Sequence, residues 1–455
     1  MVVFTANSHG RWDETSNETG LIDRKWFHQA EQPGGRRSPS AGAAPRHRVT
    51  VDTMNAAQTA TRRVRRAMDP LTDFVHDEAA GGIALAIATL AALVWVNSPV
   101  GDSYSSFWGS ELTLGFDSLA IREDLQHWVN DALMALFFFV VGLEIKRELV
   151  TGELRERRAA ALPVLAALGG AVLPALIFLL LTAGSAGGEG WAIPMATDIA
   201  FAVGVLALLG DRVSAGVKLL VLTIAIVDDI IAISVIAVFY SDDLSATWLL
   251  AALAGLGLVV LLRRAGVARV LAYVPVGLFV WVATLESGVH ATIAGVALGL
   301  LTPARPIAGR HVLEEIEHRL HPITSFAVVP LFALANAGVV LNATTLGDAA
   351  TSRVAWAIVL GLVIGKLLGI AGASLLGLRL GVGTLPEGVQ PRQIWGVAAL
   401  GGIGFTVSLF IAQLAFTDPA TVDLAKVGIF AGSLASGALG ALLLIRTTPR
   451  AHQRR

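Results

Sequence analysis

The sequence predicts an all-α polytopic membrane protein with twelve transmembrane helices, and three observations support this fold class. The chain has 455 residues, of which 54% are hydrophobic and only 15% are charged, whereas soluble domains carry about 25% charged residues. Its mean hydropathy is +0.66. Apolar runs that are long enough to cross a bilayer as helices recur along the chain.

The composition excludes several classes of function. A net charge of −1 argues against a nucleic-acid partner, because proteins that bind nucleic acids carry basic patches. The chain contains no cysteine, which excludes disulfides, thiolate metal sites and cysteine nucleophiles.

Residues 1–70 differ from the rest of the chain, because they are mostly polar and end in the basic cluster at 62–66. No continuous apolar run precedes a small-residue cleavage site, so this stretch is not a secretory signal peptide. We predict a disordered, basic, cytoplasmic tail. Its basic cluster either touches anionic lipid, or the tail is solvated and has no role. A second cytoplasmic tail is predicted at residues 447–455.

Residues 71–446 are predicted to form one twelve-helix domain, which begins with a short interfacial helix at 71–78. A small extramembrane hairpin is expected within 97–122. The predicted spans are residues 79–96, 125–149, 159–181, 191–209, 215–240, 246–262, 270–285, 290–301, 322–341, 354–376, 394–416 and 424–445.

An even number of spans places both termini on one side of the membrane. Lys and Arg gather in the loops after the second, fourth, sixth, eighth and tenth spans, while the opposite loops carry only Arg122, Arg353 and Lys426. Because cytoplasmic loops are enriched in Lys and Arg, both termini are predicted to be cytoplasmic.

The fourth and eleventh spans contain a weak repeat. Residues 191–203 align with residues 395–407 and share Trp191 and Trp395, Ile199 and Ile403, Phe201 and Phe405, and Val203 and Val407. By the predicted topology the two spans run in opposite directions. This indicates an inverted duplication with repeat units at about 159–240 and 354–446.

Each of these two spans also carries residues that interrupt a helix. Pro194 precedes Thr197 and Asp198 in the fourth span, and Gly401, Gly402 and Gly404 lie in the eleventh. We predict two broken helices that cross in mid-membrane, with the alternative that the glycines allow close helix packing. Asp198 is expected to offset the facing N-terminal ends of the half-helices, and Lys366 the facing C-terminal ends.

Asp228 and Asp229 lie within the otherwise apolar run 222–239. One carboxylate at bilayer depth costs roughly 2.5–3.5 kcal/mol, so such residues persist where they bind a proton or a metal ion. A chance pair in a soluble core strand is the alternative. Adjacent helical residues point about 100° apart, so one aspartate can hold the ion while the other contacts Lys366. The pair should titrate as a coupled unit.

Seven motifs in this order and spacing resemble those of the NhaA family of bacterial sodium/proton antiporters, over roughly residues 71–446. They are Val141-Gly142-Leu143-Glu144-Ile145-Lys146-Arg147-Glu148, Ala196-Thr197-Asp198-Ile199-Ala200-Phe201, Ile226-Val227-Asp228-Asp229, Gly288-Val289-His290-Ala291, Leu334-Ala335-Asn336-Ala337-Gly338, Gly365-Lys366 and Gly401-Gly402-Ile403-Gly404-Phe405-Thr406.

The resemblance implies an electrogenic transporter in the bacterial inner membrane, active at alkaline pH, that expels sodium or lithium in exchange for external protons. It implies neither enzymatic activity nor a cofactor. It further implies that Asp229, with Asp228, binds sodium transiently, that Asp228 pairs with Lys366, and that Thr197 and Asp198 complete the polar centre. The residues that match a cytoplasmic pH-activation cluster are Glu144, Arg147, Glu148, Glu317, His318 and His321. Asp131 matches a carboxylate near the outer end of the second span.

Several alternatives stay open. Lys366 either releases a proton during exchange or is a fixed salt bridge, and His290 is either a sensor or an interfacial residue. Residues 317–321 either sense pH, because histidine titrates in the physiological range, or form a solvated helix. A homodimer through the 97–122 hairpin is expected by analogy alone. Rival functions are a sodium-coupled solute symporter, an intramembrane aspartyl protease that uses Asp198 and Asp229, and an ion channel or inert scaffold.

Overall fold

The computed structural model describes residues 80–115, 121–241, 244–267, 269–306 and 309–447. The predicted N-terminal tail (1–70), the interfacial helix (71–78) and nearly all of the C-terminal tail (447–455) lie outside the described residues. A two-stranded antiparallel hairpin, β1 (Glu111–Leu114) and β2 (Ile121–Asp124), follows α2 (Asp102–Trp108). The expected hairpin is therefore present, and it extends two residues beyond the predicted range. The remaining described elements are helical.

Within the described part of the chain, six helical segments are long and apolar enough to cross a membrane. Four are α5 (Arg157–Thr182), α7 (Ala215–Phe239), α8 (Ala246–Arg264) and α18 (Pro419–Thr447). The other two contain a π-helical turn. They are Leu125–Val150, formed by α3 (Leu125–Trp128), η2 (Val129–Leu133) and α4 (Met134–Val150), and Arg353–Arg379, formed by α14 (Arg353–Leu360), η8 (Gly361–Gly365) and α15 (Lys366–Arg379).

Three shorter apolar helical segments accompany them. These are Ala80–Val96, Val270–Leu285 (η6, Val270–Ala272, and α9, Val274–Leu285) and α10 (Thr292–Leu301). Large apolar side chains such as Leu180 and Leu208 are 76% and 85% exposed, as expected for helices that face lipid. Apart from its hairpin, the described part of the chain is all-α, and it has the helices of a multi-pass membrane protein.

Two further helix pairs are bent at a short break. The first pair, η4 (Ala186–Met195) and α6 (Ile199–Leu209), bends by 41°, and the second, α16 (Ile394–Leu400) and α17 (Phe405–Ala415), by 47°. A short turn, η9 (Pro391–Gln393), precedes α16. The half before the first break is a 3₁₀ helix that begins at residue 186, five residues before the predicted span. The glycines of this segment and Pro194 explain why it is a 3₁₀ helix and not an α-helix, because both residue types disfavour an α-helix interior.

The ninth span differs from its prediction at residues 322–341. The chain forms α11 (Val312–Ile323), η7 (Thr324–Val328) and α12 (Val329–Asn336), and is then non-helical up to α13 (Ala343–Thr351). The hydroxyl group of Tyr104 shares its one proton between the carbonyls of Leu334 and Ala335, at 2.9 and 2.8 Å. Because another element satisfies these last-turn carbonyls, the helix ends at residue 336 without leaving them unpaired.

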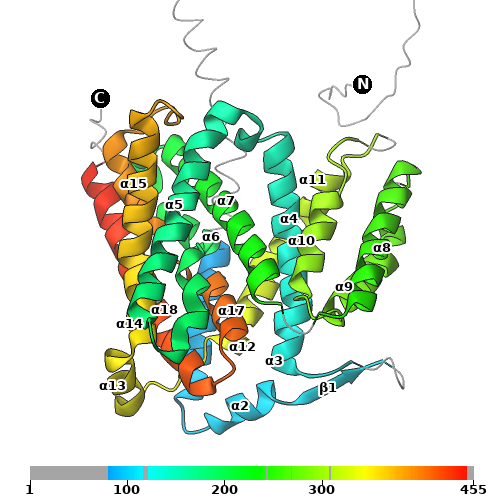
Figure 1. The fold of residues 1–455 in the computed structure, drawn as a ribbon, viewed down its shortest axis with the longest axis horizontal. Coiled ribbons are helices and arrows are strands. Elements are labelled where there is room, and N and C mark those ends of the chain that lie inside the picture. The colour runs from blue at the N-terminus through cyan, green and yellow to red at the C-terminus, as the bar shows by residue number, and fades with distance from the viewer. Residues whose placement is uncertain (1–79, 116–120, 242–243, 268, 307–308, 448–455) are drawn as a thin grey trace, which may run out of the picture. The chain divides into compact units, whose positions relative to one another are not determined.

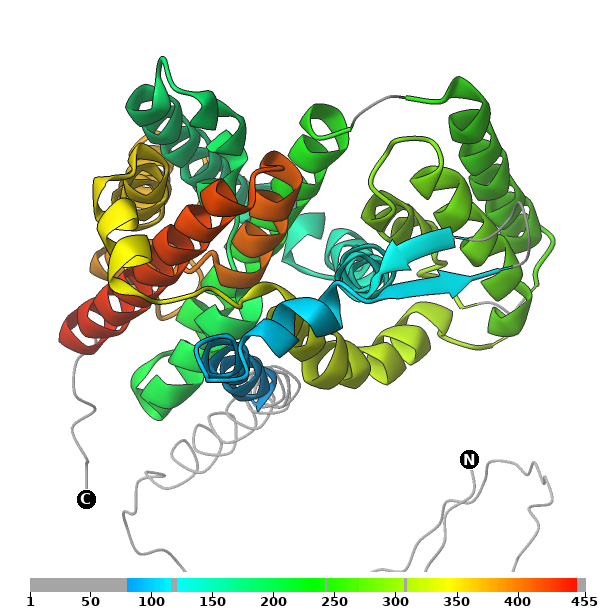
Figure 2. The ribbon, with the colours of Figure 1, turned by 90° about the horizontal axis from the view of Figure 1, so that it is seen from below.

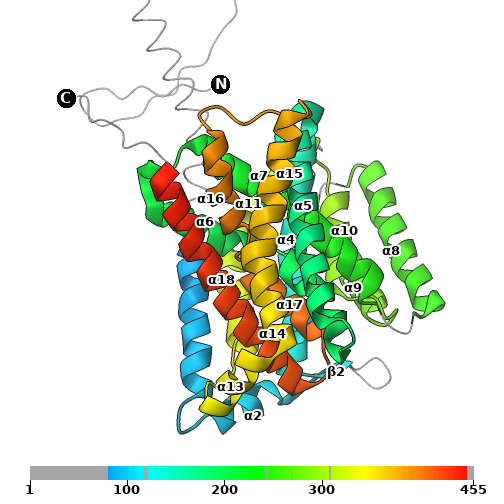
Figure 3. The same ribbon diagram turned by 60° about the vertical axis from the view of Figure 1, so that its left-hand side comes forward.

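Most of the described helices fall into two groups, whose outer members lie on the two sides of Figure 2. The first group contains α5, η4, α6, α7 and α14–α18. The second contains α2, the hairpin, α3, α4 and α8–α12. Figures 1 and 3 show α5 and α15 side by side in the first group. A Cβ atom at Gly169 would lie 2.3 Å from the carbonyl oxygen of Gly369, so these two helices meet backbone to backbone.

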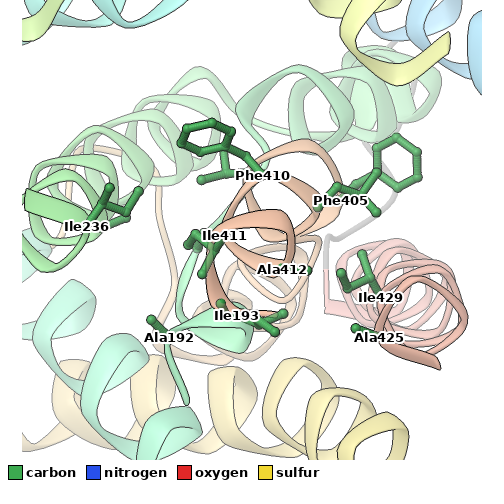
Figure 4. Packing of buried hydrophobic residues seen from close by; sticks show 14 of the residues in the cluster. Ala192, Ile193, Ile236, Phe405, Phe410, Ile411, Ala412, Ala425 and Ile429 are labelled. Carbon is green, nitrogen blue, oxygen red and sulfur yellow. The ribbon is translucent and has the colours of Figure 1, made fainter. Parts of the chain in front are cut away.

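A buried apolar cluster surrounds the second broken pair. Figure 4 shows Phe410 and Ile411 of α17 between Ile193 of η4, Ile236 of α7 and Ile429 of α18. These side chains are at most 1% exposed. Dense packing resists displacement, so it holds both breaks at fixed positions beside α7.

Candidate functional site

The buried lysine of α15 reaches the aspartate pair of α7. Lys366 and Asp228 are 0% and 2% exposed, and the Lys366 Nζ donates a hydrogen bond of 2.6 Å to Asp228 Oδ2. Lys366 Nζ also donates to Thr197 Oγ1 at 3.2 Å, and this hydroxyl donates to the carbonyl of Gly401 at 2.8 Å. The chain of contacts therefore links α15 and α7 with both helix breaks.

Asp198 joins the N-terminal ends of two half-helices. Its Oδ1 accepts a hydrogen bond of 3.0 Å from the amide of Phe201, and it is the N-cap of α6. Its Oδ2 accepts from the amide and the hydroxyl group of Thr406 in α17, at 3.0 and 2.6 Å. One carboxylate thus receives the unpaired amides of both helices and neutralises the positive ends of their dipoles.

Lys366 does not show the corresponding arrangement at the C-terminal ends. Its described partners are Asp228 and the hydroxyl group of Thr197. The Gly401 carbonyl, which follows α16, accepts its hydrogen bond from that hydroxyl group and not from Lys366. The expected electrostatic compensation therefore has the predicted form at Asp198, whereas at Lys366 the ammonium pairs with a side-chain carboxylate.

Asp229 has a different environment from its neighbour. It is 5% exposed, and its Oδ1 is buried without a hydrogen-bond partner among the described residues. Asp229 lines a cavity of about 60 Å³ together with Thr197, Asp198 and Thr406. Helices of the second group complete the wall, among them α4 through Glu144 and α11 through His321. The cavity therefore lies between the two groups, with one carboxylate oxygen free to bind a cation.

A comparison with protein families extends the sequence resemblance. The family described as Na⁺/H⁺ antiporter 1 matches residues 72–444, which is most of the chain. The chain belongs to this antiporter family.

Individual relatives carry the name NhaA. The chain is 47% identical over 395 residues to the Na⁺/H⁺ antiporter NhaA of Nocardia farcinica, covering 86% of this chain and 94% of that relative. It is 44% identical to NhaA 2 of Erythrobacter litoralis, over 83% of this chain and 94% of the relative. It is 45% identical to NhaA of Shewanella loihica, over 83% and 97%. The resemblance to the NhaA family is thus confirmed over nearly the whole length of these relatives.

Two members of the predicted NhaA-type pH cluster form an ion pair between α4 and α11, two helices that also line the cavity. Arg147 of α4 donates a hydrogen bond to Glu317 Oε1 of α11, and Glu317 is 6% exposed. The other carboxylate oxygen of Glu317 is buried and meets no hydrogen-bond donor in the described part of the chain. Burial raises the pKa of Glu317 above its ordinary value, and the charge of Arg147 opposes that rise.

The other predicted site residues, two of the cluster together with His290 and Asp131, lie outside the cavity wall. Glu148 accepts a hydrogen bond of 2.7 Å from the amide of Glu153 in the following loop, and His318 is exposed. His290 precedes α10, at the end of that helix opposite the loop to α11. Asp131 lies in η2, where its backbone carbonyl accepts a hydrogen bond of 3.0 Å from the indole of Trp281.

Thr406 is a site residue that the sequence analysis did not single out. It stands in the Gly401–Thr406 motif of the NhaA family, but nothing in the sequence paired it with Asp198, 208 positions away. A signal was available, because Thr406 is a hydroxyl residue directly after a predicted break. Backbone amides at such a break need an acceptor.

Proposed function

We propose that this protein exchanges sodium or lithium ions for protons at Asp229. The observation that carries the proposal is the partner-free carboxylate oxygen of Asp229 in a cavity that Thr197 and Asp198 also line. Sodium is a hard cation that takes oxygen ligands, and this wall offers carboxylate and hydroxyl oxygens.

Exchange follows from competition for the same oxygens. A proton on Asp229 removes the negative charge that attracts sodium, and a bound sodium ion removes the charge that attracts a proton. Asp228 is already neutralised by Lys366 at 2.6 Å, so of the two aspartates of α7 only Asp229 offers an unpaired charge to the cation. Alternating exposure of this site to the two faces then couples the two ion flows.

Electrogenic exchange requires a second proton. One sodium ion exchanged for one proton at Asp229 moves no net charge. The buried pair of Asp228 and Lys366 lies beside the site and supplies a second titratable unit. The second proton binds within this pair if Lys366 takes part in transport, whereas a purely structural Lys366 leaves it to other groups.

The cavity disfavours the two main rivals. Its volume of about 60 Å³ admits ions and a few water molecules, whereas pockets for organic ligands span about 300–1,000 Å³. An aspartyl protease needs two carboxyl groups that share one proton. Both oxygens of Asp198 already accept hydrogen bonds from Phe201 and Thr406, so Asp198 is a poor partner for Asp229.

The membrane arrangement is proposed on the same basis. Twelve spans result when the six long segments, the two bent pairs, the three shorter helices and the run from the end of α11 through α12 are each taken as one span. The bent pairs are inverted repeats whose breaks cross in mid-membrane. The distribution of Lys and Arg places both termini and the mouth beside Glu144 and His321 in the cytoplasm of a bacterial cell. Lipid and a second copy, bound through the hairpin, are the expected partners, and no cofactor is needed.

Activation at alkaline pH is assigned to the Glu317–Arg147 pair. Because the pKa of Glu317 is raised, this carboxyl group ionises at a higher pH than an exposed glutamate. Ionisation strengthens its attraction to Arg147 and so changes how α11 is held against α4 beside the cavity. Glu144 and His321 line the cavity and transmit the change to the ion.

The proposal is tested with purified protein in liposomes that carry an imposed pH gradient. Addition of sodium should collapse the gradient between about pH 6.5 and 8.5, a window that overlaps the upper part of the range in which histidine titrates. Potassium serves as the control ion. A gradient that is unaffected by sodium and lithium would refute exchange.

A further inference from the structure

Lys426 is a buried cation that the ion site does not use. It lies in α18, 8% exposed, and its Nζ donates a hydrogen bond of 2.9 Å to the carbonyl of Gly338 and one of 3.2 Å to Asp423 Oδ1. Asp423 lies three residues earlier on the same helix. A buried ammonium needs partners, and the partner across the interface is the Gly338 carbonyl.

The hydrogen bond to Gly338 joins the two helix groups. Lys426 belongs to the first group, in which α18 also contacts the second break through Ser433, whose hydroxyl accepts from the amide of Phe405 at 3.2 Å. Gly338 follows α12 of the second group. Its amide donates to the hydroxyl group of Tyr104 at 3.2 Å, and a Cβ atom at Gly338 would lie 2.4 Å from the Tyr104 ring. The Gly338 carbonyl is therefore fixed to the second group.

This contact and the mouth of the cavity lie at opposite ends of the same interface. Glu144 and His321, which line the cavity, stand near the end of α4 that leads to α5 and near the end of α11. Lys426 lies near the start of α18, beside the far end of α12, and Figure 3 shows this end of α18 next to α13 and α2. The two groups are thus joined at the end that the cavity does not reach.

We propose that Lys426 is a latch that closes the outer end of the interface, and that its hydrogen bond to Gly338 must break before the ion site can open to that side. This rests on the proposed exchange function. Rocking of one bundle against the other exposes the site alternately in secondary transporters, the NhaA family among them. Apolar contacts such as Phe332 with Phe410, whose ring centroids are 6.2 Å apart, are non-directional and can slide. A directional hydrogen bond from an ammonium group cannot slide, so it sets the barrier at this end.

Site accessibility tests the latch without depending on transport. The chain has no cysteine, so single reporter cysteines need no further changes. Ser325→Cys reports on the cavity, and Ala337→Cys reports on the buried segment beside the latch. Both variants are labelled in full-length protein with a small, charged, membrane-impermeant thiol reagent. The reagent is added on the cytoplasmic side for Ser325→Cys and on the outer side for Ala337→Cys. Lys426→Met, which removes the ammonium, is compared with Lys426→Arg, which keeps a charged donor.

In Lys426→Met, labelling of Ser325→Cys should slow and labelling of Ala337→Cys should accelerate, so that the ratio of the Ala337→Cys rate to the Ser325→Cys rate rises by about tenfold or more, the factor expected for a lost hydrogen bond from a charged donor. Lys426→Arg should resemble the unchanged protein. A purely structural role for Lys426 would loosen the fold and accelerate both reporters together, which overturns the proposal. Unchanged rates at both reporters overturn it as well. If labelling behaves as expected but liposomes show no sodium response, the exchange function fails while the latch stands.

Discussion

The ammonium group of Lys366 lies 2.6 Å from the carboxylate of Asp228, in a contact between α15 and α7 that leaves neither side chain more than 2% exposed. The two residues are 138 positions apart in the sequence. Their pairing divides the adjacent aspartates of α7, because it neutralises Asp228 and leaves Asp229 to face the cavity. Substitution of Asp228 is therefore expected to affect stability, whereas substitution of Asp229 is expected to affect ion binding.

Replacing one residue of the Lys366–Asp228 pair should destabilise the protein more than replacing both. Asp228→Asn or Lys366→Gln alone leaves a buried charge unpaired, and such changes destabilise by roughly 3–5 kcal/mol. The double variant, Asp228→Asn with Lys366→Gln, leaves no charge and should recover most of the lost thermal stability. Melting temperatures in detergent for the four proteins form a double-mutant cycle. Additive losses would show that the pair is not coupled.

The same variants separate the two roles of Lys366. If Lys366 carries the second proton, a folded double variant should exchange sodium without moving net charge. Sodium-driven currents on supported membranes measure this directly. A current that persists at the level of the unchanged protein would make Lys366 structural.

Asp198 should be required for the position of both broken helices. Asp198→Ala removes the acceptor of the Phe201 amide and of both Thr406 donors, so it should destabilise the protein by about 4 kcal/mol or more, since hydrogen bonds to charged groups contribute about 1.5–3 kcal/mol each. Thr406→Val is the matched control, because it removes only the hydroxyl donor and should cost less. Unfolding in detergent and exchange in liposomes are measured together. Intact stability and transport in Asp198→Ala would contradict this role.

Close approach of α5 and α15 should be sensitive to a single methyl group. A Cβ atom at Gly369 would lie 2.2 Å from the carbonyl oxygen of Gly169, whereas a Cβ atom at Gly372 on the same helix meets nothing within 4 Å. Gly369→Ala should therefore destabilise by about 1–3 kcal/mol, the range for overpacking, and displace Lys366. Gly372→Ala should be neutral. Equal melting temperatures for the two variants would show that the helices separate freely.

Glu317 should make stability fall as pH rises. Burial raises its pKa, so the folded protein holds this proton more tightly than the unfolded chain does. The stabilising effect is complete below pH 4.5, the ordinary pKa, and is lost as pH rises through the higher folded value. Thermal melting of the unchanged protein and Glu317→Gln across this range checks the sign. The unchanged protein should lose stability relative to the variant as pH rises.

Glu315→Gln on the same helix is the control. A hydrogen bond from Arg310 lowers the pKa of the partly exposed Glu315, so its small effect should have the opposite sign. A gap between the unchanged protein and Glu317→Gln that stays constant with pH would refute the effect of burial on Glu317.

The sequence predicted α7 and its aspartates because hydropathy and charge are local properties. The run at 215–240 corresponds to a helix at Ala215–Phe239. Partners across the fold could be predicted only in part. The expectation that one aspartate contacts Lys366 agrees with the structure, while the link from Asp198 to Thr406 depends on how α6 and α17 pack, which no local pattern encodes.

The ninth span shows where prediction from local hydropathy fails. Residues 337–341 are apolar enough to continue a helix, and the sequence prediction therefore extended it. The structure ends α12 at Asn336, because side chains from other elements, including Tyr104 and Lys426, bind the nearby carbonyls. Such tertiary hydrogen bonds compete with the helix and lie outside the reach of hydropathy.

The central claim is that sodium and protons compete for the carboxylate of Asp229. The direct test is isothermal titration calorimetry of sodium into purified protein at a series of pH values. The unchanged protein is compared with Asp229→Asn, and a variant of an exposed carboxylate, Asp348→Asn, is the control. Sodium affinity should weaken as pH falls, by about tenfold per pH unit when one proton is displaced. Binding should be absent in Asp229→Asn and unchanged in Asp348→Asn. A sodium affinity that does not change with pH, or that survives in Asp229→Asn, would contradict the account.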